Sequence, residues 1–311
     1  MRNTAIEVSS LTKRFGSFVA VNHIDFRVDS GSIFGLLGAN GAGKTTTIRM
    51  LCGLLAADAG SAVLDGIDVM AAPEAVKRRI GYMSQRFSLY RDLTVDENLE
   101  FFAGLYGASA AVDRSERLNR IAAVGLAGRE NDLAGNLPGG LAQKLALSCA
   151  VAHHPAVLFL DEPTAGVDPA SRRVFWNLIH ELAEGGTTVV VTTHYLDEAE
   201  YCDQIVMMHA GGIVASGGPG ELKERVIPGV VLEVEGERVM ELTSLLGAES
   251  WILETALFGD SLHVQVQDGI GAQEASRRLA AAASNFGFTR IHIEPIVPSL
   301  EDVFLRVLEE A

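Results

Sequence analysis

The first part of the chain alternates apolar and polar positions with a period of two, a pattern typical of half-buried strands. The alternation covers residues 4–35 and is interrupted by Gly16 and by an Asp-Ser-Gly turn sequence at 29–31. Three segments are apolar almost throughout, which predicts fully buried strands; they are 32–38, 156–163 and 187–194.

Helical spacing of apolar residues separates these strands. It appears at 45–55, 94–107, 114–126 and 171–186, and the segment from 84 to 152 is mostly helical. A strand and turn are expected at 60–69, and a hairpin with a Gly211-Gly212 turn at 203–218. Buried strands that alternate with helices predict an α/β fold with a mainly parallel sheet covered on both faces.

The composition changes after Gly217. Residues 217–230 are expected to form a connection, and the pattern beyond it predicts strands at 230–237, 261–267 and 290–296 and helices at 271–286 and 299–311. Residues 226–311 hold 14 Asp and Glu against five Arg and no Lys. We therefore expect a domain at 1–222 and a small, acidic α+β domain at 223–311.

The net charge excludes one large class of partner. The chain has 311 residues, 48% of them hydrophobic, with a formal charge of −15 and three widely spaced cysteines. An acidic chain binds nucleic acid poorly through a general phosphate field, so no nucleic-acid partner is expected. Without a signal-like start or a run of about 18 apolar residues, we expect a soluble chain that reaches a membrane only through a partner.

The strongest local motif follows the strand at 32–38. It fits G-x-x-x-x-G-K-[ST] in full, between an apolar strand and a helix, and it comprises Gly38, Ala39, Asn40, Gly41, Ala42, Gly43, Lys44 and Thr45, with Thr46 next. Successive backbone N–H groups in such a loop form an anion nest at the positive end of a helix. Lys44 is expected to reach the β- and γ-phosphates of a nucleoside triphosphate, and Thr45 to hold Mg²⁺.

Two acids end the apolar strand at 156–163. Asp161 is placed to bind Mg²⁺ directly or through water. Glu162 beside it is placed to polarise the attacking water, although a solvated loop acid is the alternative. Both acids and the loop predict nucleoside triphosphate hydrolysis, but they occur in many folds.

The order of further motifs resembles the ATP-binding subunit of an ABC transporter over about residues 4–220. The segments at 34–51, 80–107 and 158–169 are similar to bacterial drug-export ATPases of the daunorubicin-resistance and multidrug type. The resemblance implies a P-loop NTPase core, an antiparallel β subdomain and a helical subdomain at about 86–150. It also implies that ATP hydrolysis powers transport.

The same resemblance implies roles for four further residues. Phe15 matches the aromatic that stacks on adenine, with a core aromatic as the alternative. Gln85 matches the glutamine that senses the metal and the attacking water and reports to the membrane partner. His194 matches the histidine that contacts the γ-phosphate, and Asp168 matches an acid at the dimer interface that can also cap the helix that follows.

One segment departs from the family pattern. At the position of the Leu-Ser-Gly-Gly signature stands Leu137-Pro138-Gly139-Gly140. In the family the serine hydroxyl bonds the γ-phosphate of the ATP held by the opposite subunit, which Pro138 cannot do. With Pro138 expected at the first helical position, the amides of Gly139 and Gly140 and the helix end remain available, so we expect an altered signature that still works.

The resemblance also implies partners. Two such subunits, here expected as a homodimer, would sandwich two ATP molecules and act on an integral membrane permease at the cytoplasmic face of the inner membrane. Drug-like or lipophilic compounds are the expected cargo, and the C-terminal domain is expected to dimerise or regulate. Whether the partner is instead a second ATPase with an ordinary signature stays open at this point.

Two other classes remain as alternatives. A soluble ABC-type ATPase of DNA repair would need a long coiled coil, and one of translation usually holds two ATPase halves and a basic linker. A phosphotransferase with the same loop would leave Gln85, the signature-like segment and His194 unexplained. Copurification with a membrane protein, and not with ribosomes or DNA, would distinguish a transporter ATPase from the soluble ABC-type ATPases.

Overall fold

The computed structural model describes residues 3–85, 89–105, 114–247, 249–288 and 290–309, and these form two units. The first unit is Met1–Gly218 and the second is Pro219–Ala311. The second begins with helix α8 (Pro219–Val226), where the sequence predicts only a connection. A proline at the first helical position is compatible with a helix. The division between the two units lies at 218/219, before the boundary expected at 222/223.

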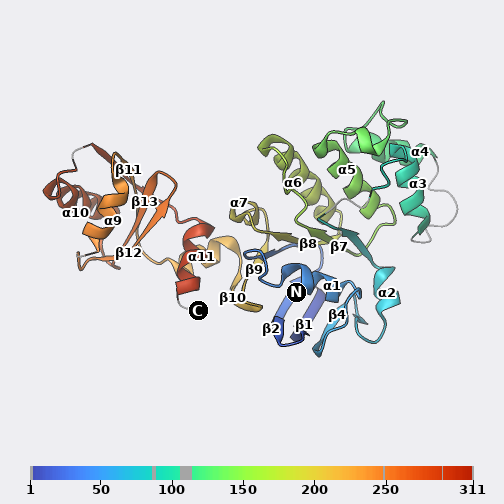
Figure 1. Cartoon of the computed structure of the whole chain (residues 1–311), viewed down its shortest axis with the longest axis horizontal. Helices are drawn as coiled ribbons and strands as arrows, with labels where there is room; N and C mark the ends of the chain where they lie inside the picture. Colours follow the sequence, from blue (N-terminus) through green and yellow to red (C-terminus); the bar gives the residue numbers. More distant parts are fainter. Residues whose placement is uncertain (1–2, 86–88, 106–113, 248, 289, 310–311) are drawn as a thin grey trace. The chain divides into compact units, whose positions relative to one another are not determined.

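The first unit is built around a six-stranded sheet, part of which is labelled in Figure 1. The order of its strands is β10-β9-β3-β8-β7-β6. Its strands are β3 (Ile33–Leu37), β6 (Ile80–Met83), β7 (Val157–Asp161), β8 (Thr188–Thr193), β9 (Gln204–His209) and β10 (Gly212–Gly217). All neighbours are parallel except β9 and β10. Every residue of β3, β7 and β8 is buried, as expected for strands in the middle of such a sheet.

The hairpin of β9 and β10 turns one residue earlier than the sequence predicts. His209 pairs with Gly212, so the two-residue turn is Ala210-Gly211 and not Gly211-Gly212. Both turn residues have positive φ, 47° and 85°, as the type I′ turn of a tight hairpin requires. An alanine therefore occupies a position at which sequence rules favour glycine or asparagine.

A second sheet is antiparallel, with the order β2-β1-β4-β5. It contains β1 (Thr4–Phe15), β2 (Phe18–Asp29), β4 (Ala59–Leu64) and β5 (Ile67–Asp68). Its buried residues, such as Ile6, Leu11 and Leu64, share one core with residues of the parallel sheet, such as Phe34 and Phe159. The two sheets therefore share one core, which also contains Ala42 of the loop that follows β3.

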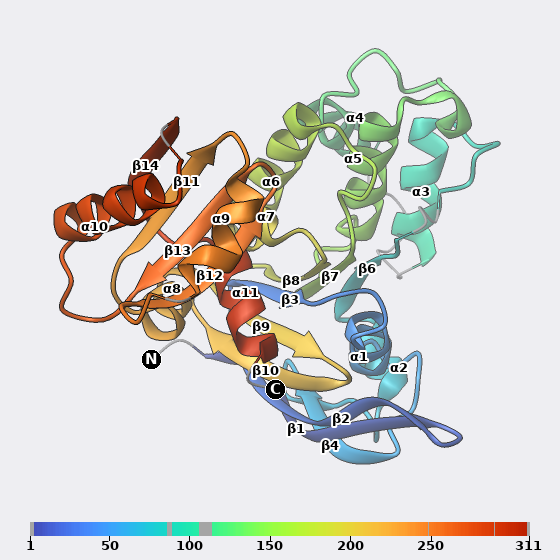
Figure 2. The same cartoon turned by 60° about the vertical axis from the view of Figure 1, so that its left-hand side comes forward.

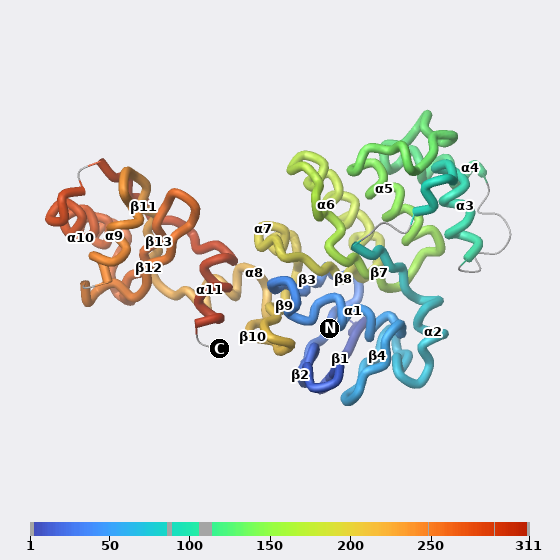
Figure 3. Tube along the Cα trace, viewed as in Figure 1, coloured from blue at the N-terminus to red at the C-terminus, as the bar shows by residue number. Residues whose placement is uncertain are grey.

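Helices complete the first unit. They are α1 (Lys44–Leu51), α2 (Pro73–Lys77), α3 (Val95–Leu105), α4 (Arg114–Ala123), α5 (Gly139–Ala150), α6 (Pro169–Glu184) and α7 (Leu196–Ala199), with a short 3-10 turn at Ala134–Asn136. Figure 3 shows α3, α4 and α5 grouped together, and they share a small core around Leu99, Ile121 and Leu145. This group corresponds to the helical part expected at 86–150, of which 86–88 and 106–113 lie outside the described residues.

None of the helices that the structure describes combines the length and apolarity that a membrane crossing demands.

The second unit is a ferredoxin-like β-α-β-β-α-β arrangement. Its elements are β11 (Val231–Gly236), α9 (Val239–Leu246), β12 (Ile252–Phe258), β13 (Ser261–Val266), α10 (Ala272–Asn285) and β14 (Ile291–Ile296), in the antiparallel order β12-β13-β11-β14. Figure 2 shows α9 and α10 against the strands, and a core that includes Leu232, Val264, Leu242 and Leu279 joins these helices to the sheet. The sequence predicts the α+β class, but it misses α9 and β12.

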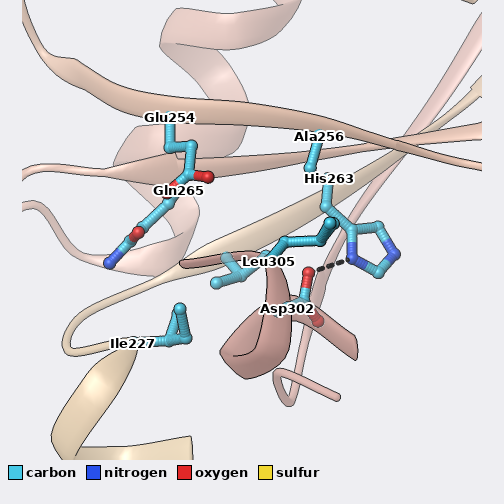
Figure 4. Close-up of a pocket in the computed structure, with 8 residues that line it drawn as sticks. Ile227, Glu254, Ala256, His263, Gln265, Asp302 and Leu305 are labelled. Carbon is cyan, nitrogen blue, oxygen red and sulfur yellow. Dashed lines mark hydrogen bonds and ion pairs between the residues drawn. The ribbon is translucent and has the colours of Figure 1, made fainter. Parts of the chain in front are cut away.

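The last helix, α11 (Leu300–Glu309), contacts the opposite face of this sheet. His263 of β13 alternates with the core residues Leu262 and Val264 and therefore points away from α9 and α10. Its Nδ1 lies 2.7 Å from Oδ1 of Asp302 on α11 (Figure 4). This contact joins the C-terminal helix to the sheet.

Candidate functional site

The glycine-rich loop lies where the sequence predicts it, between β3 and α1. Gly43 precedes the first residue of α1 with φ 107°, and a Cβ there would lie 2.5 Å from the carbonyl oxygen of Ala20. A Cβ on Gly38 would lie 2.3 Å from the carbonyl oxygen of Met208. Both positions therefore need glycine, because the loop packs tightly against β2 and β9.

The loop borders a cavity of about 420 Å³. Its wall contains most of the predicted loop residues, residues of β1 and β2, and one residue after each of β6 and β7: Phe15, Phe18, Ala20, Asn40, Gly41, Gly43, Lys44, Thr45, Thr46, Gln85 and Glu162. Gly38 and Ala42 are not part of this wall. Ala42 is buried in the core, and Gly38 packs against Met208. These two residues therefore support the conformation of the loop without facing the cavity.

Lys44 is buried beside two acids. Its Nζ donates to the carbonyl oxygens of Gly38 and Ala39 at 2.7 and 3.2 Å and lies 3.8 Å from Oε1 of Glu162. Burial lowers the pKa of Lys44, while the charges of Glu162 and Asp161 oppose that shift. The ammonium is thus held at the cavity wall by carbonyl groups that an anionic ligand can replace.

Asp161 ends β7 with hydroxyl groups around one carboxylate oxygen. Thr45 Oγ1 donates to Oδ1 of Asp161 at 3.1 Å, and Thr192 Oγ1 donates to the same oxygen at 2.7 Å. Tyr82 of β6 also hydrogen-bonds this carboxylate, and burial together with the charge of Asp161 raises the pKa of Tyr82 to about 12. The carboxylate is therefore fixed in place from three neighbouring elements.

The carboxylate of Glu162 contacts two polar residues that the sequence predicts at the same site, Gln85 and His194. Gln85 Nε2 donates to Oε2 of Glu162 at 2.9 Å, and His194 Nδ1 lies 3.3 Å from the same oxygen. The backbone of Glu162 has φ 49°, a left-handed conformation that is uncommon outside glycine. The residue directly after β7 thus turns its carboxylate toward Gln85, His194 and Lys44.

Phe15 lies at the wall of the cavity and not in the core. It ends β1 and pairs with Phe18 at the start of β2, and their exposed fractions are 52% and 61%. The alternative of a core aromatic is therefore excluded for Phe15. Phe18 was missed, although an aromatic directly across a Gly-Ser turn from Phe15 was a usable signal.

The remaining predicted residues form a second group, at two helix starts. Gly139 and Gly140 begin α5, and Asp168 caps α6 by accepting from the N–H of Ser171 at 2.9 Å. A Cβ on Gly140 would lie 3.2 Å from Oγ of Ser171, so the two helix starts are adjacent. None of these residues belongs to the described wall of the cavity.

Pro138 is one position earlier relative to its helix than the sequence predicts. It is the N-cap of α5, with φ −53° and ψ 147°, and Gly139 is the first helical residue. The carbonyl oxygen of Pro138 accepts from the N–H groups of Leu141 and Ala142 at 2.9 and 3.0 Å. The extended conformation of an N-cap suits proline, but the position lacks the side-chain acceptor that Ser or Thr supplies there.

The buried carboxylate of Glu198 contacts three segments near the site, through Thr164, Thr193 and Arg172. It is fully buried, accepts from Oγ1 of Thr164 and Oγ1 of Thr193, and lies 3.2 Å from Nε of Arg172. Burial raises the pKa of Glu198, an effect that the two hydroxyl groups and Arg172 oppose. The segment after Glu162, the residue before His194 and the first turns of α6 thus share one carboxylate, which no local sequence signal indicated.

The sequence of this chain is similar to those of known ATP-binding proteins. A family model described as "ABC transporter" matches residues 21–165, and one described as "AAA domain, putative AbiEii toxin, Type IV TA system" matches 137–196. The chain is 49% identical over 221 residues to "Probable multidrug ABC transporter ATP-binding protein YbhF" of Escherichia coli. That match covers 71% of this chain and 38% of the relative, so the chain spans well under half of that protein.

The matches to other relatives cover a larger share of each relative. "Nod factor export ATP-binding protein I" of Rhizobium etli is 34% identical over 305 residues, which cover 98% of this chain and 93% of the relative. "Daunorubicin/doxorubicin resistance ATP-binding protein DrrA" of Streptomyces peucetius is 42% identical over 220 residues, or 70% of this chain and 67% of the relative. A solved structure, "Structure of ATP binding subunit of ABC transporter", matches with a TM-score of 0.65 and 30% identity over 71% of this chain and 93% of its own.

Proposed function

This chain belongs to the family of ABC transporter ATP-binding subunits, which hydrolyse ATP, and we propose that it powers an exporter through a separate membrane permease. The arrangement around Glu162 is the observation that carries this proposal. A carboxylate that lies close to Gln85, His194 and Lys44 at the wall of the 420 Å³ cavity is suited to polarise a water molecule beside a γ-phosphate.

The residues have distinct roles in the proposed reaction. Lys44 exchanges the carbonyl groups of Gly38 and Ala39 for the β- and γ-phosphates of ATP, and the loop amides bind the phosphate oxygens. Phe15 stacks on the adenine base. Glu162 accepts the proton of the attacking water, and His194 orients the γ-phosphate next to it.

The geometry fits a magnesium ion bound between protein and ATP. The hydroxyl oxygen of Thr45 and Oδ1 of Asp161 lie 3.1 Å apart, and Mg²⁺ prefers such oxygen ligands together with phosphates. Within the described residues no three His, Cys, Asp or Glu side chains gather to hold a metal by themselves. Thr45 and Asp161 would hold the ion, with Gln85 beside Glu162 sensing it; when bound, Mg²⁺ neutralises charge on the phosphates.

A second copy of the chain completes the site in this proposal. Gly139, Gly140 and Asp168 lie together at two helix starts and not at the wall of the ATP cavity of their own chain. Their free helix amides are suited to the ATP of an opposite subunit. ATP would then favour a closed homodimer, and hydrolysis would release it.

Closure is proposed to reach the permease through the helices α3–α5, because Gln85 directly precedes that part of the chain and touches Glu162. The ATPase would lie at the cytoplasmic face of the inner membrane, held there by the permease. The relatives are named for multidrug transport, Nod factor export and daunorubicin/doxorubicin resistance, so drug-like or lipophilic compounds are the proposed cargo. We assign the second unit a dimerising or regulatory role.

Copurification followed by reconstitution tests the proposal. The tagged full chain should copurify with the co-encoded integral membrane protein, and the complex in vesicles should hydrolyse ATP and move a lipophilic dye. Lys44→Ala is the matched control, since it should copurify equally but lose ATP affinity and transport. Recovery of the chain with ribosomes or DNA and without a membrane protein would favour the soluble ABC-type ATPases instead.

A further inference from the structure

The carboxyl ends of β7 and β8 lie side by side. Asp161 is the register partner of Thr192 in this parallel pair, and neighbours in register point to the same face of a sheet. Both side chains are almost fully buried, with 2% and 0% of their surfaces exposed. The hydroxyl of Thr192 is therefore confined next to the two acids that follow one another in the chain.

That hydroxyl has two contacts, and each reaches a different acid. It donates to Oδ1 of Asp161 at 2.7 Å and accepts from the backbone N–H of Glu162 at 2.9 Å. The same N–H also lies 3.1 Å from the carbonyl oxygen of Thr192. One side chain thus fixes the carboxylate of the first acid and the backbone of the second.

The backbone contact matters because Glu162 is left-handed, with φ 49°. Such a conformation is unfavourable for a residue with a side chain and persists where its surroundings hold it. It directs the carboxylate of Glu162 to Gln85 and His194. In an ordinary extended conformation the same side chain would point elsewhere, because successive strand residues alternate in direction.

From this geometry we propose that Thr192 is a positioning residue for ATP hydrolysis, which sets Asp161 for the metal and Glu162 for the water through one hydroxyl. The proposal rests on the functional roles assigned above. Thr45 also donates to Asp161 but is itself a proposed metal ligand, whereas Thr192 is not among the residues that line the cavity. Thr192 is therefore the contact that can be removed without changing a ligand.

The test replaces this hydroxyl in the full-length chain and measures three quantities. Thr192→Val and Thr192→Cys remove the hydroxyl, and Thr192→Ser retains it, so that Cys and Ser differ by one atom. The turnover of the Val and Cys variants should fall by about 10–100-fold, and the Mg²⁺ concentration for half-maximal activity should rise, as for other groups that orient metal ligands. ATP affinity measured without Mg²⁺ should not change, and Thr192→Ser should stay near wild type.

Thr188→Val is the matched control. Thr188 is buried on the same strand, and its hydroxyl accepts from the N–H of Gly31 at 3.0 Å, far along β8 from the two acids. This variant should hydrolyse ATP like the wild type. Wild-type turnover and Mg²⁺ dependence in both Thr192→Val and Thr192→Cys would overturn the proposal, as would equal losses in Thr188→Val and Thr192→Val or a Ser variant as impaired as Cys.

Glu162→Gln, measured in parallel, separates two kinds of failure. If Glu162→Gln is inactive and the Thr192 variants are normal, the inference about Thr192 fails and the proposed function stands. If Glu162→Gln itself turns over like the wild type, the role proposed for Glu162 fails, and the inference about Thr192 fails with it.

Discussion

The amide nitrogen of Gln85 lies 2.9 Å from the carboxylate oxygen Oε2 of Glu162, although 77 positions separate the two residues. Gln85 follows the edge strand β6, and Glu162 follows its parallel neighbour β7. Parallel strands bring their carboxyl ends to one edge of a sheet, which is where ligands bind in open α/β sheets. In the proposed function, a change at Glu162 on ATP hydrolysis would therefore act directly on Gln85, the residue that precedes the helices α3–α5.

The exposed pair Phe15 and Phe18 predicts how the base is bound. Phe15→Ala should weaken ATP binding by about 1–3 kcal/mol, the range for base stacking, which corresponds to roughly 5- to 150-fold. It should not weaken competition by inorganic triphosphate, which lacks a base. Titration of a fluorescent ATP analogue measures both.

Phe18→Ala is the companion variant for that titration, because Phe18 faces the same cavity from the next strand. If Phe15→Ala binds ATP as tightly as the wild type while Phe18→Ala does not, then the predicted stacking residue is wrong and Phe18 has that role.

Replacing Pro138 by serine restores a hydroxyl at the signature position and is expected to increase ATP-driven dimerisation or turnover. At the N-cap of α5, serine supplies the acceptor that proline lacks, which stabilises a helix by about 0.5–2 kcal/mol. The same hydroxyl is suited to the γ-phosphate of an opposite subunit. Pro138→Ser should therefore leave the fold intact and raise ATP-driven dimerisation or turnover modestly, measured by light scattering and by phosphate release.

Pro138→Ala is the control for Pro138→Ser, because it removes the ring without adding a hydroxyl. Equal effects of Ser and Ala would mean that the hydroxyl is irrelevant, and a complete loss of activity in the Ser variant would contradict an altered but working signature.

The pair His263–Asp302 predicts a pH dependence for the second unit. Burial alone would lower the pKa of His263, but the hydrogen bond and charge of Asp302, with the charge of Glu233, raise it above 6.5. Burial would raise the pKa of Asp302, but bonds from His263 and Ser299 hold it below 3.8. The raised histidine stabilises the fold below pH 6.5, and this contribution is lost as the pH rises through its folded pKa.

Asp302 acts in the opposite direction, since its contribution is present above pH 3.8 and is lost in stronger acid. The contact between α11 and the sheet in Figure 4 is therefore strongest between those two values. Amide exchange of 300–309 should be slower in the wild type than in His263→Gln at pH 6, and this difference should shrink toward pH 9. His292→Gln, at an exposed histidine, is the control; a difference constant over that range would contradict the account.

Local patterns were enough to predict the phosphate loop and the buried strands, because a strand, a glycine-rich turn and a helix follow one another without a gap. The same approach missed α9, a helix of eight residues that follows Arg238 in a left-handed conformation, φ 66°, although Gly247 directly follows the helix. It also misplaced the β9–β10 turn, where alanine adopts a glycine-like conformation. Short elements held by packing leave a weak local signal.

The contacts of the site were predictable in part. Glu162, Gln85, His194 and Lys44 were named from motifs, but their distances and roles could not be read from spacing. Thr192 and Glu198 carry no motif of their own, because their importance comes from strand register and from burial between segments far apart in the chain. Nonlocal register is decided by the packing of the whole sheet, so these two residues became visible only in the structure.

The central claim is that Glu162 polarises the attacking water, and single-turnover ATP hydrolysis by Glu162→Gln tests it most directly. The variant should bind ATP like the wild type and accumulate as an ATP-bound dimer, and its hydrolysis should be at least about 100-fold slower, the lower range for loss of a general base. Glu184→Gln, at the exposed end of α6, should hydrolyse ATP normally. Wild-type hydrolysis by Glu162→Gln would contradict the account.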